Sequence, residues 1–255
     1  MLNFDNKKRE FDFWLKSKLS FSPPMFKFNK VKIDRILSEF NTPQKKCYDA
    51  LTSRYKIEKW SLVCSGSEFL GNLCFLELLD HYLGDKTLQG PALDIGSRNF
   101  WYAPALKSFY QESWTGVEVD AYQRYLTGHT RKAYAEYMVA PFPRMQYQAH
   151  CLTQLTGQHG LITWFLPYIL SEPMEASGLP DRFFDPMILF EHVWQLLAPE
   201  GHLFIINQEQ EEAREQEKLL QDKGITYEAL GLMESVFSTY QKERFGFLVT
   251  KNQTP

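Results

Sequence analysis

Two short polar segments, each at the end of a predicted strand, carry the residues best suited to hold a polar ligand. In the first, Asp94 and Gly96 close a short apolar run, and a helical pattern follows. A strand that ends in Asp-x-Gly and turns into a helix offers a tight turn, exposed backbone amides and a carboxylate near a ligand. About 20 residues later, Glu118 ends the next apolar run, where a carboxylate can accept both hydroxyls of a ribose. Together the segments indicate a site for an adenosine-type cofactor.

The surrounding pattern predicts the elements that bring these residues to one edge of a sheet. From residue 91 short apolar runs alternate with helical patterns, which implies a parallel sheet with right-handed crossovers. The expected strands are 92–96, 114–119, 145–149, 161–165 and 202–206, and the expected helices are 103–110, 121–137, 181–197 and 208–223. Segments 225–230 and 245–250 are expected to form a closing antiparallel pair. Ligands in such folds lie at the carboxyl ends of the strands.

The chain ahead of this region is predicted to be helical. Apolar spacing indicates helices at 31–40, after Pro43, and at 67–82, where Gly84 ends the pattern. We therefore expect residues 1–66 to form an N-terminal helical cap or substrate segment and residues 67–255 to form the main domain.

Composition excludes several classes of protein. The chain has 255 residues and is 44% hydrophobic, which is enough apolar surface for a sizeable core and excludes a disordered or fibrous protein. No run of apolar residues is long enough to span a membrane, and the first 21 residues do not form a secretory signal, so we expect a cytoplasmic protein without a membrane partner. The cysteines lack C-x-x-C spacing, which favours buried free thiols over a metal site or disulfides; they are Cys47, Cys64, Cys74 and Cys151.

Charge is unevenly distributed along the chain. Residues 1–60 hold 14 Lys and Arg against 7 Asp and Glu, whereas residues 61–255 hold 14 against 24. The basic segment is either an arm for an anionic partner or a cap docked on an acidic body. We favour the docked cap, because aromatic residues suited to packing are interleaved with the basic ones.

Four segments in this order resemble the motifs of the class I S-adenosylmethionine-dependent methyltransferases. They are LDIGS at 93–97, TGVEVD at 115–120, LITWFLPY at 161–168 and LLAPEGHLFII at 196–206. The resemblance implies an α/β, Rossmann-like fold with a seven-stranded sheet, helices on both faces and the last strand inserted antiparallel. It also implies S-adenosylmethionine as cofactor and methyl transfer as the activity.

The resemblance assigns roles to the two polar segments. Asp94 and the backbone of Gly96 and Ser97 would approach the methionine part of the cofactor. Glu118 would hold the ribose hydroxyls, and Val119 would lie against the adenine.

Other expected cofactor contacts occupy positions where this sequence departs from the family. The family's loop has two or three glycines, but here only Gly96 is present, and Asn99 is expected to take the left-handed backbone geometry of a missing one. After the third strand, His150 and Cys151 stand where an acid usually bonds the adenine amine, and His150 could accept from that amine only through an unprotonated ring nitrogen. Thr163, in the fourth-strand motif, completes the expected set.

The sequence identifies no catalytic residue, and transfer from a sulfonium requires mainly alignment of the acceptor in a dry pocket. Residues 166–184, rich in Pro, Met and aromatics, and the N-terminal segment are expected to select a small aromatic or lipophilic acceptor. Two alternatives remain open: a non-catalytic binding module that keeps the fold, and a nucleic-acid methyltransferase that uses the basic N-terminal segment. A nicotinamide enzyme is disfavoured because G-x-G-x-x-G is absent.

Overall fold

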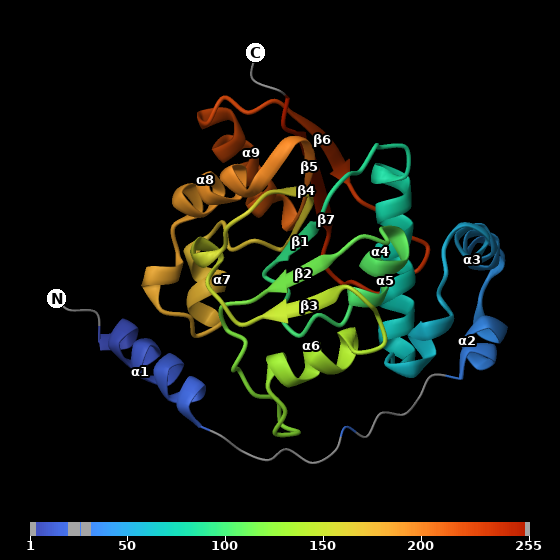
Figure 1. Ribbon diagram of the computed structural model, residues 1–255, viewed down its shortest axis with the longest axis horizontal. Helices are drawn as coiled ribbons and strands as arrows, with labels where there is room; N and C mark the ends of the chain where they lie inside the picture. The colour runs from blue at the N-terminus through green and yellow to red at the C-terminus, as the bar shows by residue number, and fades with distance from the viewer. Residues whose placement is uncertain (1–3, 20–25, 27–31, 253–255) are drawn as a thin grey trace.

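A seven-stranded sheet forms the centre of the computed structural model, which describes residues 4–19, 26 and 32–252 (Figure 1). In sheet order the strands are β3 Met145–Gln148, β2 Trp114–Val117, β1 Ala92–Ile95, β4 His159–Phe165, β5 Leu197–Gln208, β7 Arg244–Thr250 and β6 Tyr227–Leu232. Strand β7 is antiparallel to both of its neighbours, and the other pairs are parallel. The predicted Rossmann-like class I methyltransferase sheet, with its last strand inserted antiparallel, is confirmed.

Helices cover both faces of this sheet (Figure 1). One face packs against α4 Gly66–Leu83, α5 Ala103–Phe109 and α6 Arg131–Val139, and the other against α8 Pro186–Leu196 and α9 Glu209–Asp222. Side chains alternate between the two faces, so on β5 Phe204 and Ile206 enter the first core while Leu203 and Ile205 enter the second. A sheet buried on both faces explains why its strands appear in the sequence as continuous apolar runs.

Local capping chemistry sets the start of several helices. Ser65 accepts a hydrogen bond from the amide of Glu68 and the Glu68 carboxylate accepts from the amide of Ser65, so α4 begins with a capping box. Asn41 and Gln44 form the same arrangement at α3 Thr42–Arg54. The predicted helices at 31–40, after Pro43 and at 67–82 are therefore confirmed as α2 Ile33–Glu39, α3 and α4.

The N-terminal helices lie on two different sides of the molecule. Helix α1 Phe4–Lys18 lies beside α7 Ser171–Ala176, whereas α2 and α3 lie on the opposite side, next to α4 (Figure 1). Apolar side chains such as Phe40 and Leu51 join α2 and α3 to the core on the α4 face. The boundary between residues 1–66 and 67–255 stays a prediction.

The expected helix at 121–137 is wrong in its first half. Residues 121–130 form a turn in which Arg124 pairs with Thr130, and Gly128 adopts a φ of +84° at its tip. The helix then begins at Arg131, because the Thr130 side chain accepts a hydrogen bond from the amide of Ala133. Within the predicted range, only the part from α6 onward is helical. The dipeptide Thr127-Gly128 lies in the turn, where glycine is typical.

The expected helix at 181–197 is also interrupted. Asp181–Phe183 forms a short 3-10 helix, and α8 starts only at Pro186. The Asp185 side chain caps α8 by accepting a hydrogen bond from the amide of Ile188. Strand β5 is longer than the predicted 202–206 and begins directly at Leu197. The remaining predicted elements are confirmed within a few residues, and two further 3-10 helices are present, at Glu58–Leu62 and Leu152–Gln154.

None of the helices in the described part of the chain has the length and apolarity needed to cross a membrane. All four cysteines are free thiols; Cys64 and Cys74 are buried as predicted, while Cys47 and Cys151 are half-buried.

Candidate functional site

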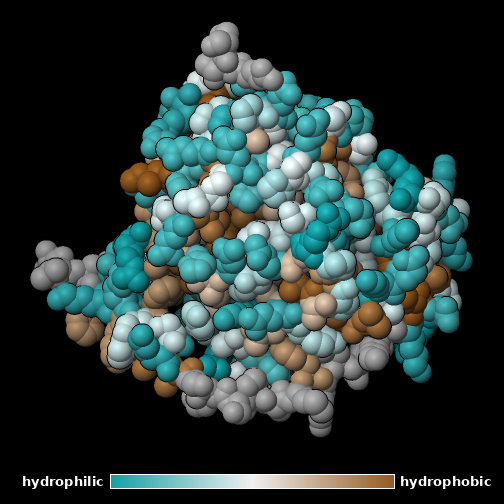
Figure 2. Space-filling model, viewed as in Figure 1, coloured by the Kyte–Doolittle hydropathy of each residue, from teal (hydrophilic) through white to brown (hydrophobic). Residues whose placement is uncertain are grey.

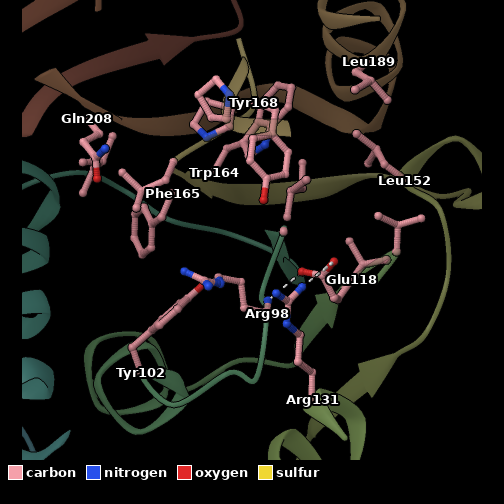
Figure 3. Close-up of a pocket in the computed structure, with 18 of the residues that line it drawn as sticks. Arg98, Tyr102, Glu118, Arg131, Leu152, Trp164, Phe165, Tyr168, Leu189 and Gln208 are labelled. Atoms are coloured by element: carbon pink, nitrogen blue, oxygen red, sulfur yellow. Dashed lines mark hydrogen bonds and ion pairs between the residues drawn. The ribbon is translucent and has the colours of Figure 1, made fainter. Parts of the chain in front are cut away.

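A cavity of about 510 Å³ lies at the carboxyl ends of the parallel strands, where the sequence placed the ligand. Its walls come from the ends of β1, β2, β4 and β5 and from the loops that follow them. Figure 3 shows Glu118 and Leu152 on one side of the cavity and Phe165 and Gln208 on the other. Figure 2 shows brown, hydrophobic atoms in a recess among more hydrophilic ones on the same face of the molecule. The size is typical of a pocket for a small molecule.

The loop after β1 keeps the backbone geometry of a glycine-rich loop although it has lost most of its glycines. Gly96, Arg98 and Phe100 have φ values of 69°, 49° and 52°, so every second residue is left-handed. For the two non-glycine residues this costs about 1–2 kcal/mol each. Asn99 does not adopt this geometry, so the expectation that it replaces a glycine is wrong. Arg98 and Phe100 occupy the left-handed positions instead.

Burial of the Phe100 ring offsets part of this cost. The ring is completely buried and packs edge to face on Tyr102, with the ring centroids 5.7 Å apart. Gly116 makes this possible, because a Cβ atom there would lie 2.7 Å from the Phe100 ring and 2.9 Å from Oγ of Ser97. A glycine on β2 is therefore required where the loop carries a phenylalanine.

Backbone and side-chain hydrogen bonds fix the rest of the loop. The amides of Gly96 and Ser97 both donate to the carbonyl of Val117, at 2.9 and 3.0 Å. The carbonyl of Arg98 accepts from Tyr147 Oη at 2.5 Å. The loop is thus held to β2 and β3 independently of any ligand.

Glu118 is the carboxylate on the cavity floor directly after β2. One oxygen accepts from the amide of Arg98 at 2.8 Å and the other from the amide of Asp120 at 2.7 Å. Arg131 lies 4.0 Å from Glu118 and 3.1 Å from Asp120. Figure 3 shows the guanidinium of Arg131 beside the Glu118 carboxylate. The side chain of Glu118 is 6% exposed and faces the cavity, so its orientation is fixed before a ligand arrives.

Asp94 lies beneath the cavity wall rather than in it. Its carboxylate accepts from Thr163 Oγ1 at 2.6 Å and from Tyr102 Oη at 2.8 Å. Asp94 and Thr163 are completely buried, and burial raises the pKa of the Asp94 carboxyl to about 7. Ser97 is buried too, and its hydroxyl donates to the backbone carbonyl of Asp94. These three predicted residues thus support the wall that Tyr102 presents to the cavity.

The other predicted site residues separate into two groups. Gly96, Val119, His150 and Cys151 line the cavity together with Glu118, so the structure brings five of the nine predicted residues to one surface. Asn99 is half-buried and is not part of the lining. The roles of all nine toward a cofactor stay predictions.

Several lining residues were not anticipated from the sequence. Arg98 and Arg131 lie beside Glu118, Tyr102 is a further lining residue, and a polar group at the far end comes from β5, α9 and β7. The far group consists of Gln208, Glu212, Tyr240 and Arg244. Gln208 and Arg244 lie just outside two predicted strands that proved to be neighbours in the sheet, but no pattern in the sequence indicated that their side chains would reach the cavity.

Residues 166–184 form one wall of the cavity, as expected. Leu166, Tyr168, Pro173 and Phe183 are among its lining residues. No described residue before Phe75 lines it, so the N-terminal helices reach the cavity only indirectly.

Helix α1 docks against this wall through charge pairs and an aromatic contact. Arg9 pairs with Asp181, Glu10 pairs with Arg182, and the rings of Phe13 and Phe183 lie 4.9 Å apart. Helix α1 is therefore docked on the main domain, as favoured, but one of these two ion pairs places the acidic residue on α1. The remaining basic residues of 20–31 lie outside the described residues.

Comparison with known proteins returned methyltransferases among solved structures. No protein-family model and no curated protein matches this chain. The plantazolicin methyltransferase BpumL, solved in complex with SAH, is 12% identical over 98% of this chain and 100% of its own, with a TM-score of 0.47. A SAM-dependent methyltransferase from Aquifex aeolicus is 14% identical over 74% of this chain and 100% of its own, with a TM-score of 0.48. Ribosomal protein L11 methylase from Lactobacillus delbrueckii subsp. bulgaricus is 13% identical over 71% and 78%, with a TM-score of 0.48.

The fold class is defined by the chain's own strand order. Strand β7 is antiparallel between β5 and β6, and the cavity lies at the carboxyl ends of β1 and β2. This arrangement is the Rossmann-like fold of class I methyltransferases.

Proposed function

We propose that this chain is an S-adenosylmethionine-dependent methyltransferase that acts on a small, aromatic or lipophilic acceptor. The observation that carries the proposal is the juxtaposition of Glu118 with the left-handed loop Gly96–Arg98–Phe100 at the floor of one cavity. The order of the sequence motifs supports it, and the apolar character of residues 166–184 supports the acceptor class.

The residues around Glu118 fit an adenosine-type cofactor. A carboxylate has about four acceptor positions, and the amides of Arg98 and Asp120 use two of them, so ribose hydroxyls can take the others. Val119 and Leu152 offer an apolar surface beside it for an adenine ring. An ideal Cβ on Gly96 would meet no atom within 4 Å, which shows open space at the turn.

Arg98 gives the same half of the cavity a positive charge. Its side chain is exposed to the cavity and makes no hydrogen bond or ion pair with any described residue. A guanidinium at this place would bind the carboxylate of the cofactor's methionine part. The residue that replaces a glycine thus adds a contact that glycine could not make.

The chain's own contribution to the reaction is to bind, orient and exclude water. When bound, S-adenosylmethionine would supply a sulfonium methyl group to the acceptor's lone pair, with S-adenosylhomocysteine as the leaving group and the acceptor's proton released to solvent. Trp164, Phe165 and Tyr168 provide an apolar wall over the strand ends, which favours alignment of a flat acceptor in a dry site.

Calorimetric titration with S-adenosylmethionine and S-adenosylhomocysteine tests the proposal. We expect binding to wild type and a loss of at least tenfold in affinity in Glu118→Gln, because ribose hydroxyls lose a charged acceptor. Glu112→Gln, an exposed carboxylate ahead of β2, is the matched control and should bind normally.

A radiolabelled methyl-transfer screen with small aromatic, nucleic-acid and protein acceptors completes the test. Turnover confined to RNA or protein would overturn the acceptor class. Cofactor binding with no turnover on any class would favour the binding-module alternative. No cofactor binding by folded wild type would overturn the proposed function.

A further inference from the structure

The cavity extends well beyond the half that would hold the cofactor. It spans the ends of five neighbouring strands, β2, β1, β4, β5 and β7, which at about 4.8 Å per strand corresponds to roughly 19 Å. Glu118 and Arg98 lie over β2 and β1, at one end. The half over β5 and β7 therefore remains for the acceptor.

Aromatic rings form the middle of this acceptor half. Phe75 stacks on Phe165 with ring centroids 4.9 Å apart and an interplanar angle of 23°, and Tyr102 lies 4.9 Å from Phe75. The ring centroid of Tyr240 lies 6.4 Å from that of Phe75. Such a cluster favours a flat aromatic ligand, because its rings offer both faces and edges for contact.

Beyond the rings, the acceptor half ends in two opposite charges. Glu212 is held by a 2.8 Å hydrogen bond from the amide of Gln208 to its Oε2. Arg244 donates from Nη1 to the carbonyls of Lys242 and Glu243, and its guanidinium lies 4.7 Å from the centre of the Tyr240 ring. Gln208, whose amide holds Glu212, is paired in register with Arg244 on β5 and β7. The charges of Glu212 and Arg244 therefore face the same end of the cavity.

Glu212 and Arg244 influence each other electrostatically but form no ion pair with each other. No ion pair within 4.0 Å joins Glu212 or Arg244 to an oppositely charged side chain anywhere in the described chain. Burial raises the pKa of Glu212 and lowers the pKa of Arg244, and the charge of each partly opposes the effect on the other. Half-buried charges that have hydrogen-bond partners but no opposite charge in contact are costly, which favours a ligand that supplies the counterions.

An amino-acid head group is complementary to this pair. It carries an ammonium group and a carboxylate on one carbon, so it can bridge a carboxylate and a guanidinium that do not touch each other. Placing the head group at this end directs an attached ring back over the aromatic cluster and toward the cofactor half. Contacts with Glu212 and Arg244 are sufficient to fix the direction of the attached ring.

We propose that the acceptor is an aromatic amino acid, with its carboxylate on Arg244, its ammonium group on Glu212 and its ring among Phe75, Phe165 and Tyr240. This inference rests on the proposed function and specifies its acceptor. It assigns Glu212 and Arg244 as specificity-determining residues, since they bind the end of the acceptor opposite to the reacting ring substituent.

Binding measurements on the full chain test this, with and without saturating S-adenosylhomocysteine. The probes are L-tyrosine and L-tryptophan, with tyramine, which lacks the carboxylate, and 3-(4-hydroxyphenyl)propionate, which lacks the amine. We expect L-tyrosine or L-tryptophan to bind at least tenfold more tightly than the truncated probes.

Charge-neutral variants give a pattern that general destabilisation would not produce. Arg244→Gln should weaken binding of the amino acid at least tenfold and leave tyramine unchanged. Glu212→Gln should weaken the amino acid and leave 3-(4-hydroxyphenyl)propionate unchanged. Lys242→Gln and Glu209→Gln remove an exposed ion pair between α9 and the segment just before β7, and they should not change binding of any of the probes.

Each outcome decides between the proposals. If neither amino acid binds in either condition, or if the variants weaken all probes equally, the acceptor assignment is overturned. In that case binding of S-adenosylhomocysteine that depends on Glu118 still supports the proposed function. Amino-acid binding without cofactor binding would support the subsite and overturn the methyltransferase proposal.

Discussion

Tyr102 Oη donates a 2.8 Å hydrogen bond to Oδ2 of Asp94, and both side chains are almost completely buried. The pair links the first strand to the ring that walls the cavity. Asp94 therefore acts on the site through Tyr102, as a positioning residue. The hydrogen bond stabilises a buried carboxylate that, among the described residues, has no positively charged side chain in direct contact.

Removing that hydrogen bond should weaken the fold. Tyr102→Phe leaves one oxygen of a buried carboxylate without its hydroxyl partner, and we expect a loss of about 1–3 kcal/mol in the free energy of unfolding. Urea denaturation measures it. Tyr168→Phe removes a more exposed hydroxyl, and an equal loss in that variant would contradict the assignment.

Asp94 should make stability depend on pH. Because burial raises its pKa from 3.8 to about 7, the folded state binds more protons than the unfolded state between these values. The free energy of unfolding should therefore fall as the pH rises from about 4 to 7 and level off above, with a slope of up to about 1.4 kcal/mol per pH unit.

The variant Asp94→Asn isolates this effect, since its amide does not titrate. Wild type should lose stability relative to Asp94→Asn as the pH rises through this window, in denaturation curves taken from pH 4.5 to 8. A difference that stays constant across the range would show that Asp94 does not titrate there.

The left-handed backbone of Arg98 predicts that its replacement by glycine raises stability and weakens cofactor binding. Arg98→Gly removes the backbone strain and should raise the free energy of unfolding by about 0.5–1 kcal/mol, the relief being partly offset by the greater entropy of glycine in the unfolded chain. The same variant should bind S-adenosylmethionine about tenfold more weakly, because the guanidinium is lost.

Glu200→Gly is the matched control for Arg98→Gly. Glu200 has a φ of 62° at an exposed position of β5, away from the cavity. Its replacement by glycine should leave cofactor affinity unchanged. Unchanged affinity in Arg98→Gly as well would remove Arg98 from the site.

The contacts of α1 predict how firmly this helix is docked. Asp181→Asn removes the partner of Arg9 without altering any basic residue, so trypsin should cleave at the Lys and Arg residues of α1 several times faster. Glu191→Gln breaks the ion pair of α8 with Lys223 elsewhere and should leave cleavage of α1 unchanged. Equal rates in wild type and Asp181→Asn would mean that other contacts hold α1.

Sequence reasoning located the cofactor half more completely than the acceptor half. Glu118, Val119 and Gly96 follow their strands directly, and in a parallel sheet all carboxyl ends lie at one edge, so strand ends alone predict their proximity. Glu212 and Arg244 come from segments whose adjacency depends on the insertion of β7 beside β5. The resemblance implied that insertion, but no sequence signal indicated which side chains it would bring into the cavity.

The sequence by itself determined the order of strands and helices, because buried parallel strands appear as apolar runs and helices carry their own caps. Only the tertiary structure decided that Asp94 supports the cavity wall and that Arg98 and Phe100 adopt left-handed backbone. Burial of Asp94 depends on Tyr102 and Thr163, and the Phe100 conformation depends on the space left by Gly116. Such contacts join residues on different elements of the fold, and local pattern carries no information about them.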